Sequence, residues 1–153
     1  MTAGGPDRFQ DRFATETEPP RLLAICFCQR IEYEEMTRQS SLLRLVGRIF
    51  VDRLPFVMPP LRVYLAISRG NAPAPSRFDT LLSAPDGKGI FPGDHTVADW
   101  GDGIETEADV ALPEFPVVMA GAYSFSVAYG GQLLGRRQFY VSSREDSPGT
   151  HSS

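Results

Sequence analysis

The sequence predicts an all-β fold in which two antiparallel sheets, with about seven or eight strands in total, pack face to face. Apolar residues recur at every second position over short stretches, which is the period of a strand with one buried face. Proline and glycine, at 13 and 14 residues, interrupt these stretches at short intervals, and no convincing helical period is present. The 153 residues are 42% hydrophobic, which suits a single domain with a core of its own.

The C-terminal hairpin is the clearest element. Large side chains alternate with alanine and serine over residues 121–129, which places the large groups on one face of a strand. Gly130 and Gly131 follow, and a two-residue type I′ turn needs a positive φ at both positions. Residues 132–141 then return as the second strand, with Arg137, Phe139 and Val141 on one face. The pattern predicts an antiparallel hairpin around which the remaining strands are arranged.

The earlier strands are shorter and follow in order. We expect strands at residues 22–31, 41–51, 61–68, 78–84 and 104–111, with a short edge strand at 89–92. Residues 32–39 are polar and favour a turn, and residues 93–103 form the longest predicted irregular piece. Residues 54–60 contain three prolines, so we expect an extended crossover rather than a regular paired strand, with a cis peptide at one X-Pro bond.

The number and spacing of these strands favour an immunoglobulin-like β-sandwich, and an eight-stranded barrel is the alternative. Tyr123 stands at the start of a late strand, where such sandwiches often place a tyrosine whose hydroxyl bonds back to the main chain. We expect the domain to span residues 21–142. Residues 1–20 and 143–153 lack an apolar period and are predicted to be disordered tails.

Three segments together resemble a family of small, uncharacterised bacterial proteins that is known as a domain of unknown function. They are residues 22–28 with 43–50, residues 54–65, and residues 120–141 with their Gly-Gly turn. The family commonly has an acidic residue where Cys28-Gln29 stands and Phe-Pro where Leu54-Pro55 stands, so the chain departs from its pattern at both places. The resemblance implies a sandwich fold and a bacterial origin, and it brings no activity with it.

Charge and cysteine content narrow the function class. The net charge is −4, but residues 21–77 hold nine arginines and four acids (+5), while residues 78–120 hold nine acids and one lysine (−8). An acidic chain of this kind is not expected to bind nucleic acid.

Cys26 and Cys28 are too close for an unstrained disulfide and are predicted to be buried free thiols. We see no membrane segment or secretory signal and expect a cytoplasmic protein.

The acidic segment at residues 94–105 is the candidate site. Four acids, Asp94, Asp99, Asp102 and Glu105, offer oxygen ligands for a cation, and His95 offers a nitrogen. The spacing matches no EF-hand loop, and a solvated surface loop is the alternative. Trp100, the single tryptophan, is either a buried loop anchor or, if exposed, a contact residue, and Phe91 is a second aromatic candidate. We therefore name Trp100, Phe91 and His95 as candidate contact residues.

No catalytic set is evident. The sequence lacks a Gly-x-Ser-x-Gly elbow and a phosphate-binding loop, and neither cysteine has a plausible base. We expect a non-enzymatic interaction or ligand-binding module with no cofactor, which binds an unknown protein or small ligand and can form homo-oligomers through a sheet edge. The alternative is a small metal-dependent hydrolase that uses the Asp94–Asp102 loop.

Overall fold

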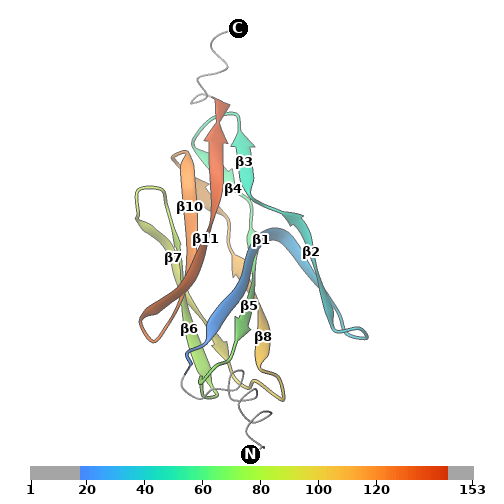
Figure 1. The fold of residues 1–153 in the computed structure, drawn as a ribbon. Helices are drawn as coiled ribbons and strands as arrows, with labels where there is room; N and C mark the ends of the chain where they lie inside the picture. Colours follow the sequence, from blue (N-terminus) through green and yellow to red (C-terminus); the bar gives the residue numbers. More distant parts are fainter. Residues whose placement is uncertain (1–17, 145–153) are drawn as a thin grey trace, which may run out of the picture.

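The computed structural model describes residues 18–144, and within them the protein consists of eleven strands and no α-helix (Figure 1). The strands in chain order are β1 (Arg21–Glu34), β2 (Gln39–Leu45), β3 (Arg48–Val51), β4 (Phe56–Met58), β5 (Leu61–Ser68), β6 (Ser76–Ser83), β7 (Gly89–Val97), β8 (Glu105–Leu112), β9 (Phe115–Val117), β10 (Gly121–Tyr129) and β11 (Gln132–Ser143). Residues 1–17 and 145–153, which make up most of the two predicted tails, lie outside the described residues. No helix of the described part is long and apolar enough to cross a membrane.

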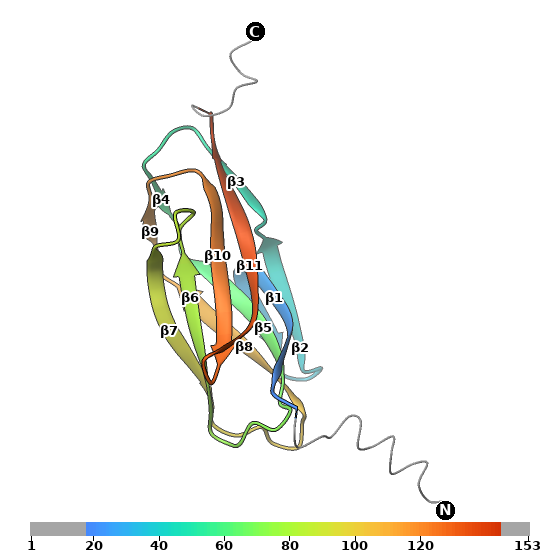
Figure 2. The same cartoon turned by 60° about the vertical axis from the view of Figure 1, so that its left-hand side comes forward.

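The strands form two larger sheets that face one another, and a small third sheet (Figure 2). Sheet A has the order β2-β1-β5-β8, and sheet B has the order β3-β11-β10-β6-β7. Strands β4 and β9 pair as a two-stranded sheet. The all-β prediction is confirmed, but the predicted strand number is too low. The prediction of purely antiparallel pairing was also wrong, because β3 runs parallel to β11.

Aromatic residues from both sheets fill the space between them. Phe27 of β1 meets Phe139 of β11 edge to face at 5.0 Å between ring centroids, and Phe139 stacks on Tyr123 of β10 at 5.4 Å. Such pairs add to the gain from burying the ring area itself. The alternation predicted for the last hairpin is confirmed, since its large residues at 123, 125, 127, 139 and 141 are all buried. The core therefore sits where the sequence pattern places it.

The predicted tyrosine corner is also present. The Tyr123 hydroxyl donates a hydrogen bond of 2.7 Å to the main-chain carbonyl of Met119, four residues upstream. Burial raises the pKa of this phenol. The bond ties the β9–β10 connection to the core, as it does in immunoglobulin-like sandwiches.

Two of the predicted segments differ from the structure where the chain changes sheets. The expected single strand at residues 41–51 is β2 and β3, which belong to different sheets. The amide of Val46 donates to Phe27 in sheet A, and the carbonyl of Gly47 accepts from Tyr140 in sheet B. A continuous apolar pattern hides such a crossing, because both halves of the segment remain strands. The predicted turn at residues 32–39 is shorter than expected, since β1 continues to Glu34.

Two other expectations fail because pairing continues past proline or glycine. Prolines flank β4 rather than interrupt it, so Phe56–Met58 keeps its amides and pairs with β9. The prediction that this segment is unpaired was therefore wrong, whereas the predicted cis bond is found at Leu54–Pro55. Strand β7 runs to residue 97, through part of the predicted irregular piece. Gly93 stands there opposite Thr80, where an added Cβ would lie only 3.2 Å from the threonine hydroxyl.

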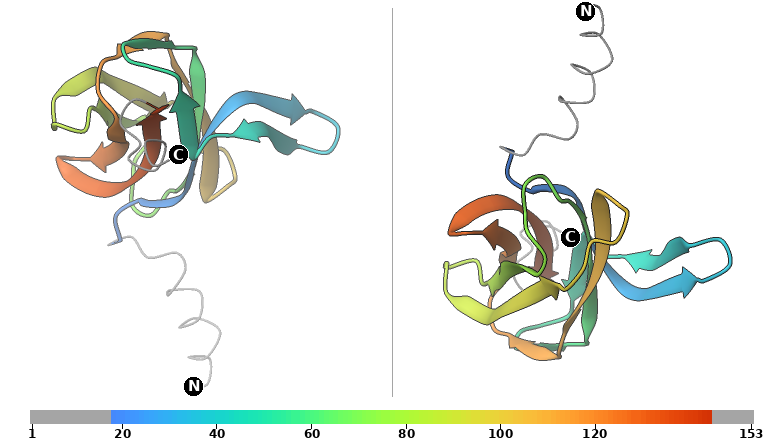
Figure 3. Two further views of the ribbon diagram at one scale, coloured as in Figure 1. Left: turned by 90° about the horizontal axis from the view of Figure 1, so that it is seen from above. Right: turned by 90° about the horizontal axis from the view of Figure 1, so that it is seen from below.

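The most distinctive part of the fold is a hairpin that leaves the sandwich. We call residues 30–45 the arm, because the end of β1 and all of β2 project sideways from the body when the molecule is seen along its length (Figure 3). Strand β1 pairs with β5 only as far as Cys28, so its remaining residues have β2 as their one neighbour in the described chain. The sandwich and the arm thus share one long strand.

Candidate functional site

The predicted acidic loop does not assemble a metal site. Asp94 lies on β7 and pairs with the Arg77 guanidinium at 3.3 Å, whereas Asp99 accepts a hydrogen bond of 2.8 Å from the amide of Gly101 in a local turn. Within residues 18–144, no group of three or more histidine, cysteine or acidic residues is arranged to hold a metal ion. The hydrolase alternative predicts carboxylates that converge, so it finds no support in this geometry.

Trp100 has the role of a loop anchor rather than that of a contact residue. It is 5% exposed, its indole N–H donates a hydrogen bond of 3.1 Å to the Ser76 hydroxyl, and its ring meets Phe78 edge to face at 6.3 Å. The Ser76 hydroxyl donates in turn to the Pro73 carbonyl. Because the ring and its one donor are both used inside the protein, Trp100 offers almost no surface to a partner.

Phe91 and His95 both lie on the edge strand β7 and face different neighbours. Phe91 is half-buried and meets Phe115 of β9 edge to face at 5.6 Å, so its ring closes the side of the core. His95 is half-buried opposite Phe78, and burial lowers its pKa although the Asp94 charge acts in the opposite direction. The structure does not join the three sequence-predicted contact residues into one exposed surface.

Four of the eleven exposed large apolar side chains of residues 18–144 lie on the arm, a segment that the sequence patterns did not single out. Tyr33 is 58% exposed, Met36 91%, Leu43 37% and Leu45 66%. Single exposed apolar residues are ordinary, but several on one projecting hairpin are typical of interaction surfaces. The signal in the sequence was the apolar character of residues 42–45 next to a polar turn, which we interpreted only as a core strand.

The arm presents an open strand edge. Strand β2 pairs with β1 on one side and has no strand on the other in the described part of the chain. Unpaired main-chain amides and carbonyls at such an edge can accept another strand, and native proteins usually guard them. Arg44 interrupts the regular strand geometry at this edge, since it has a positive φ of 60°, and its guanidinium donates to the Gln29 side chain at 3.5 Å.

A few polar contacts fix the arm to the outer face of sheet A. The Ser40 hydroxyl donates a hydrogen bond of 2.8 Å to Glu107 of β8, and the Tyr64 hydroxyl of β5 donates to the same carboxylate. Partial burial and the bond to Glu107 raise the pKa of Tyr64 to about 12. Two free cysteines lie on β1 near this face. Cys28 is buried, which raises the pKa of its thiol, and Cys26 is half-buried. The arm therefore has a defined position on the sheet.

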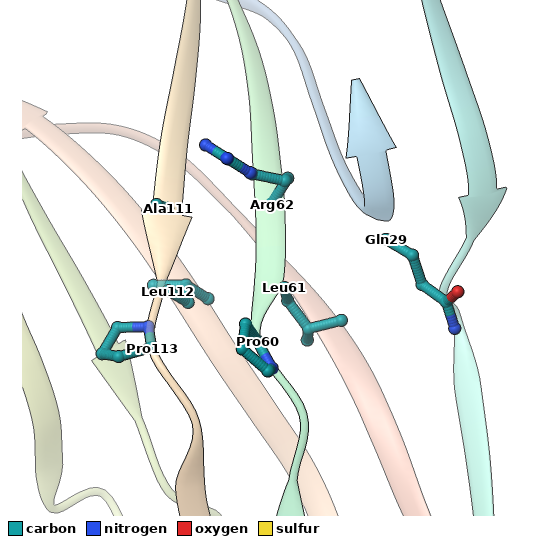
Figure 4. Close-up of a pocket in the computed structure, with 7 residues that line it drawn as sticks. All are labelled: Gln29, Pro60, Leu61, Arg62, Ala111, Leu112 and Pro113. Carbon is teal, nitrogen blue, oxygen red and sulfur yellow. The ribbon is translucent and has the colours of Figure 1, made fainter. Parts of the chain in front are cut away.

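A shallow apolar pocket lies where the arm leaves the sandwich (Figure 4). It has a volume of about 340 Å³ and is lined by Gln29, Pro60, Leu61, Arg62, Ala111, Leu112 and Pro113. Arg62 is the one charged group in this lining, and it pairs with Asp109 at 3.3 Å. With its cation already neutralised and few polar groups converging, the pocket lacks the arrangement expected of an active site.

A second hollow of about 470 Å³ lies on the outer face of sheet B. Its floor is made of alanine and serine from β10, and the exposed side chains of Arg136 and Gln138 of β11 line it. These are the small residues that alternate with the core residues of the last hairpin, so the hollow follows directly from that pattern.

Comparisons with known proteins assign neither a family nor an activity to the chain. No known protein-family model matches the chain, and no curated protein matches it. Among solved structures, it is similar to an immunoglobulin-like protein from Pseudomonas aeruginosa with a TM-score of 0.45 and 12% sequence identity. The match covers 84% of this chain and 99% of that chain. The sheet arrangement alone defines the protein as an all-β sandwich, and its function has to be argued from its own surface.

Proposed function

We propose that this protein is a non-enzymatic interaction module that binds an extended protein segment along the open edge of β2. The observation that supports this proposal is the projecting arm, whose outer strand has a free edge and exposed leucines. A bound segment would continue the β1–β2 ladder through main-chain hydrogen bonds, and alternate side chains would pack on Leu43 and Leu45.

The charge of the edge indicates the chemistry of the segment. Strand β2 and the turn residues 36–38 before it contain two arginines (Arg38 and Arg44) and no acid, while Glu34 and Glu35 precede them on the same hairpin. Neither of these arginines forms an ion pair with a carboxylate of residues 18–144. An extended segment that alternates apolar and acidic residues would match both the leucines and the arginines.

A peptide-display selection tests the proposal. Random peptides are selected on the immobilised full chain, and each recovered peptide is then tested on Leu43→Lys/Leu45→Lys, which places two charges on the edge. The control is Leu133→Lys/Val118→Lys, which changes two exposed apolar residues away from the arm. We expect acidic, extended peptides that lose binding on the arm variant and keep it on the control. Peptides that bind both variants equally well would place the binding surface elsewhere and refute the proposal.

A further inference from the structure

We propose that the segment bound by the β2 edge is β8 of a second copy of this protein, so that copies add to one another head to tail. This inference rests on the proposed function and names its partner. Its starting point is that sheet A has two open edges in the described chain, β2 at one end and β8 at the other. The two strands are similar in length, with seven and eight residues.

The two edges carry opposite charges. Strand β8 has three carboxylates at alternate positions, Glu105, Glu107 and Asp109, and no basic residue, and of these only Asp109 forms an ion pair in residues 18–144, with Arg62 at 3.3 Å. At the other edge, Arg44 on β2 and Arg38 in the turn before it have no carboxylate partner within residues 18–144. Opposite charges on neighbouring strands attract and like charges repel. Pairing of β2 with β2, or of β8 with β8, is therefore disfavoured, and only the pairing of β2 with β8 brings opposite charges together.

The strand directions are compatible with a continuous sheet. Each neighbouring pair in sheet A is antiparallel, so β2 and β8 run in opposite directions within one copy. A second copy in the same orientation would therefore present its β2 antiparallel to β8 of the first. The contacts of Glu107 with Ser40 and Tyr64 involve its side chain, and the main chain of β8 has a strand only on the β5 side in residues 18–144.

A contact of this kind joins two different surfaces and so does not close on itself as a two-fold dimer does. Repetition gives an open chain of copies or, if the rotation between copies allows it, a ring. The assembly would weaken with added salt, because the charges at both edges are exposed and screening acts on them directly. These two features, open growth and salt sensitivity, distinguish the proposed assembly from an apolar two-fold dimer.

Sedimentation velocity of the full chain at rising concentration, in low and in high salt, tests the inference. The first variant is Arg38→Glu/Arg44→Glu, and the second is Glu105→Lys/Asp109→Lys. The control is Lys88→Glu/Arg136→Glu, which makes the first variant's charge change at exposed positions of sheet B and of the turn beside it. We expect self-association of the native chain that grows with concentration and weakens with salt. Each edge variant should weaken it by roughly tenfold or more, since a tenfold change needs only a few altered charge pairs.

A mixture of the two edge variants provides the decisive measurement. Each variant alone has like charges at both edges, whereas the mixture again offers opposite charges, so association should return on mixing. A native chain that stays monomeric up to its solubility limit overturns the inference, and so does a control that weakens association as much as the edge variants do. If selected peptides still bind the β2 edge of such a monomeric chain, the inference fails while the proposed function stands.

Discussion

Replacement of Tyr123 by phenylalanine tests the packing at the centre of the fold. The change removes one hydroxyl and keeps the ring stacked on Phe139, so it creates almost no cavity. It leaves the Met119 carbonyl without the hydrogen bond of 2.7 Å that it accepts now. A typical hydrogen bond contributes about 1 kcal/mol net, and a buried group left unpaired costs about 1–3 kcal/mol, so we expect the free energy of unfolding to fall by about 2 kcal/mol.

Chemical and thermal unfolding measure this loss. For a domain of this size a loss of about 2 kcal/mol corresponds to a fall in Tm of roughly 8 °C, and the denaturant midpoint should fall with an unchanged slope. Tyr140→Phe is the matched control, because its exposed hydroxyl bonds to the Gln138 side chain and should contribute less than about 0.5 kcal/mol. If the two variants unfold alike, the hydrogen bond of Tyr123 does not stabilise the connection and our reasoning about the corner is wrong.

Three further predictions follow from single residues. Trp100→Phe loses the indole donor and some ring volume, so we expect the free energy of unfolding to fall by about 2 kcal/mol. Denaturant unfolding followed by circular dichroism measures this loss, and an unchanged unfolding midpoint would mean that the anchor is dispensable. The pKa of Tyr64 is raised to about 12 in the folded protein. Its contribution to the free energy of unfolding is therefore complete below the unfolded pKa of 10 and is lost as pH rises from 10 to 12. Stability should therefore fall over this window, less steeply in Tyr64→Phe, and equal slopes would contradict the prediction. His95 has a lowered pKa, so its contribution to stability is present above its unfolded pKa of 6.5 and is lost as pH falls through the folded pKa. An NMR titration that places the His95 midpoint at or above 6.5 would contradict its burial.

The sequence predicts the core better than the surface, and the reason is physical. Alternation in residues 121–129 and 61–68 has one explanation, a buried face, because a shift by one residue would expose every large side chain. The Gly130-Gly131 turn and the Tyr123 corner follow from local chemistry of the same kind, and both are present. Elements whose character is set within a few residues could therefore be placed from the sequence.

The crossing between sheets and the arm could not be placed in this way. Residues 41–51 look like one strand because neither Val46 nor Gly47 marks the change of sheet, which is fixed by partners at Phe27 and Tyr140. The apolar residues of β2 look like core residues, since a local pattern does not reveal whether a second layer covers them. Trp100 is the reverse case. Its polar loop suggests an exposed side chain, but the indole is buried because its N–H donates to the buried Ser76 hydroxyl. These features depend on contacts between distant parts of the chain.

Hydrogen exchange of the full chain bound to a selected peptide tests the function most directly. Our account predicts that the amides of residues 39–45 gain protection from exchange, while those of the small-residue hollow on β10 and β11 do not change. Protection confined to that hollow, or to the pocket at the root of the arm, would contradict the assignment of the β2 edge as the binding surface.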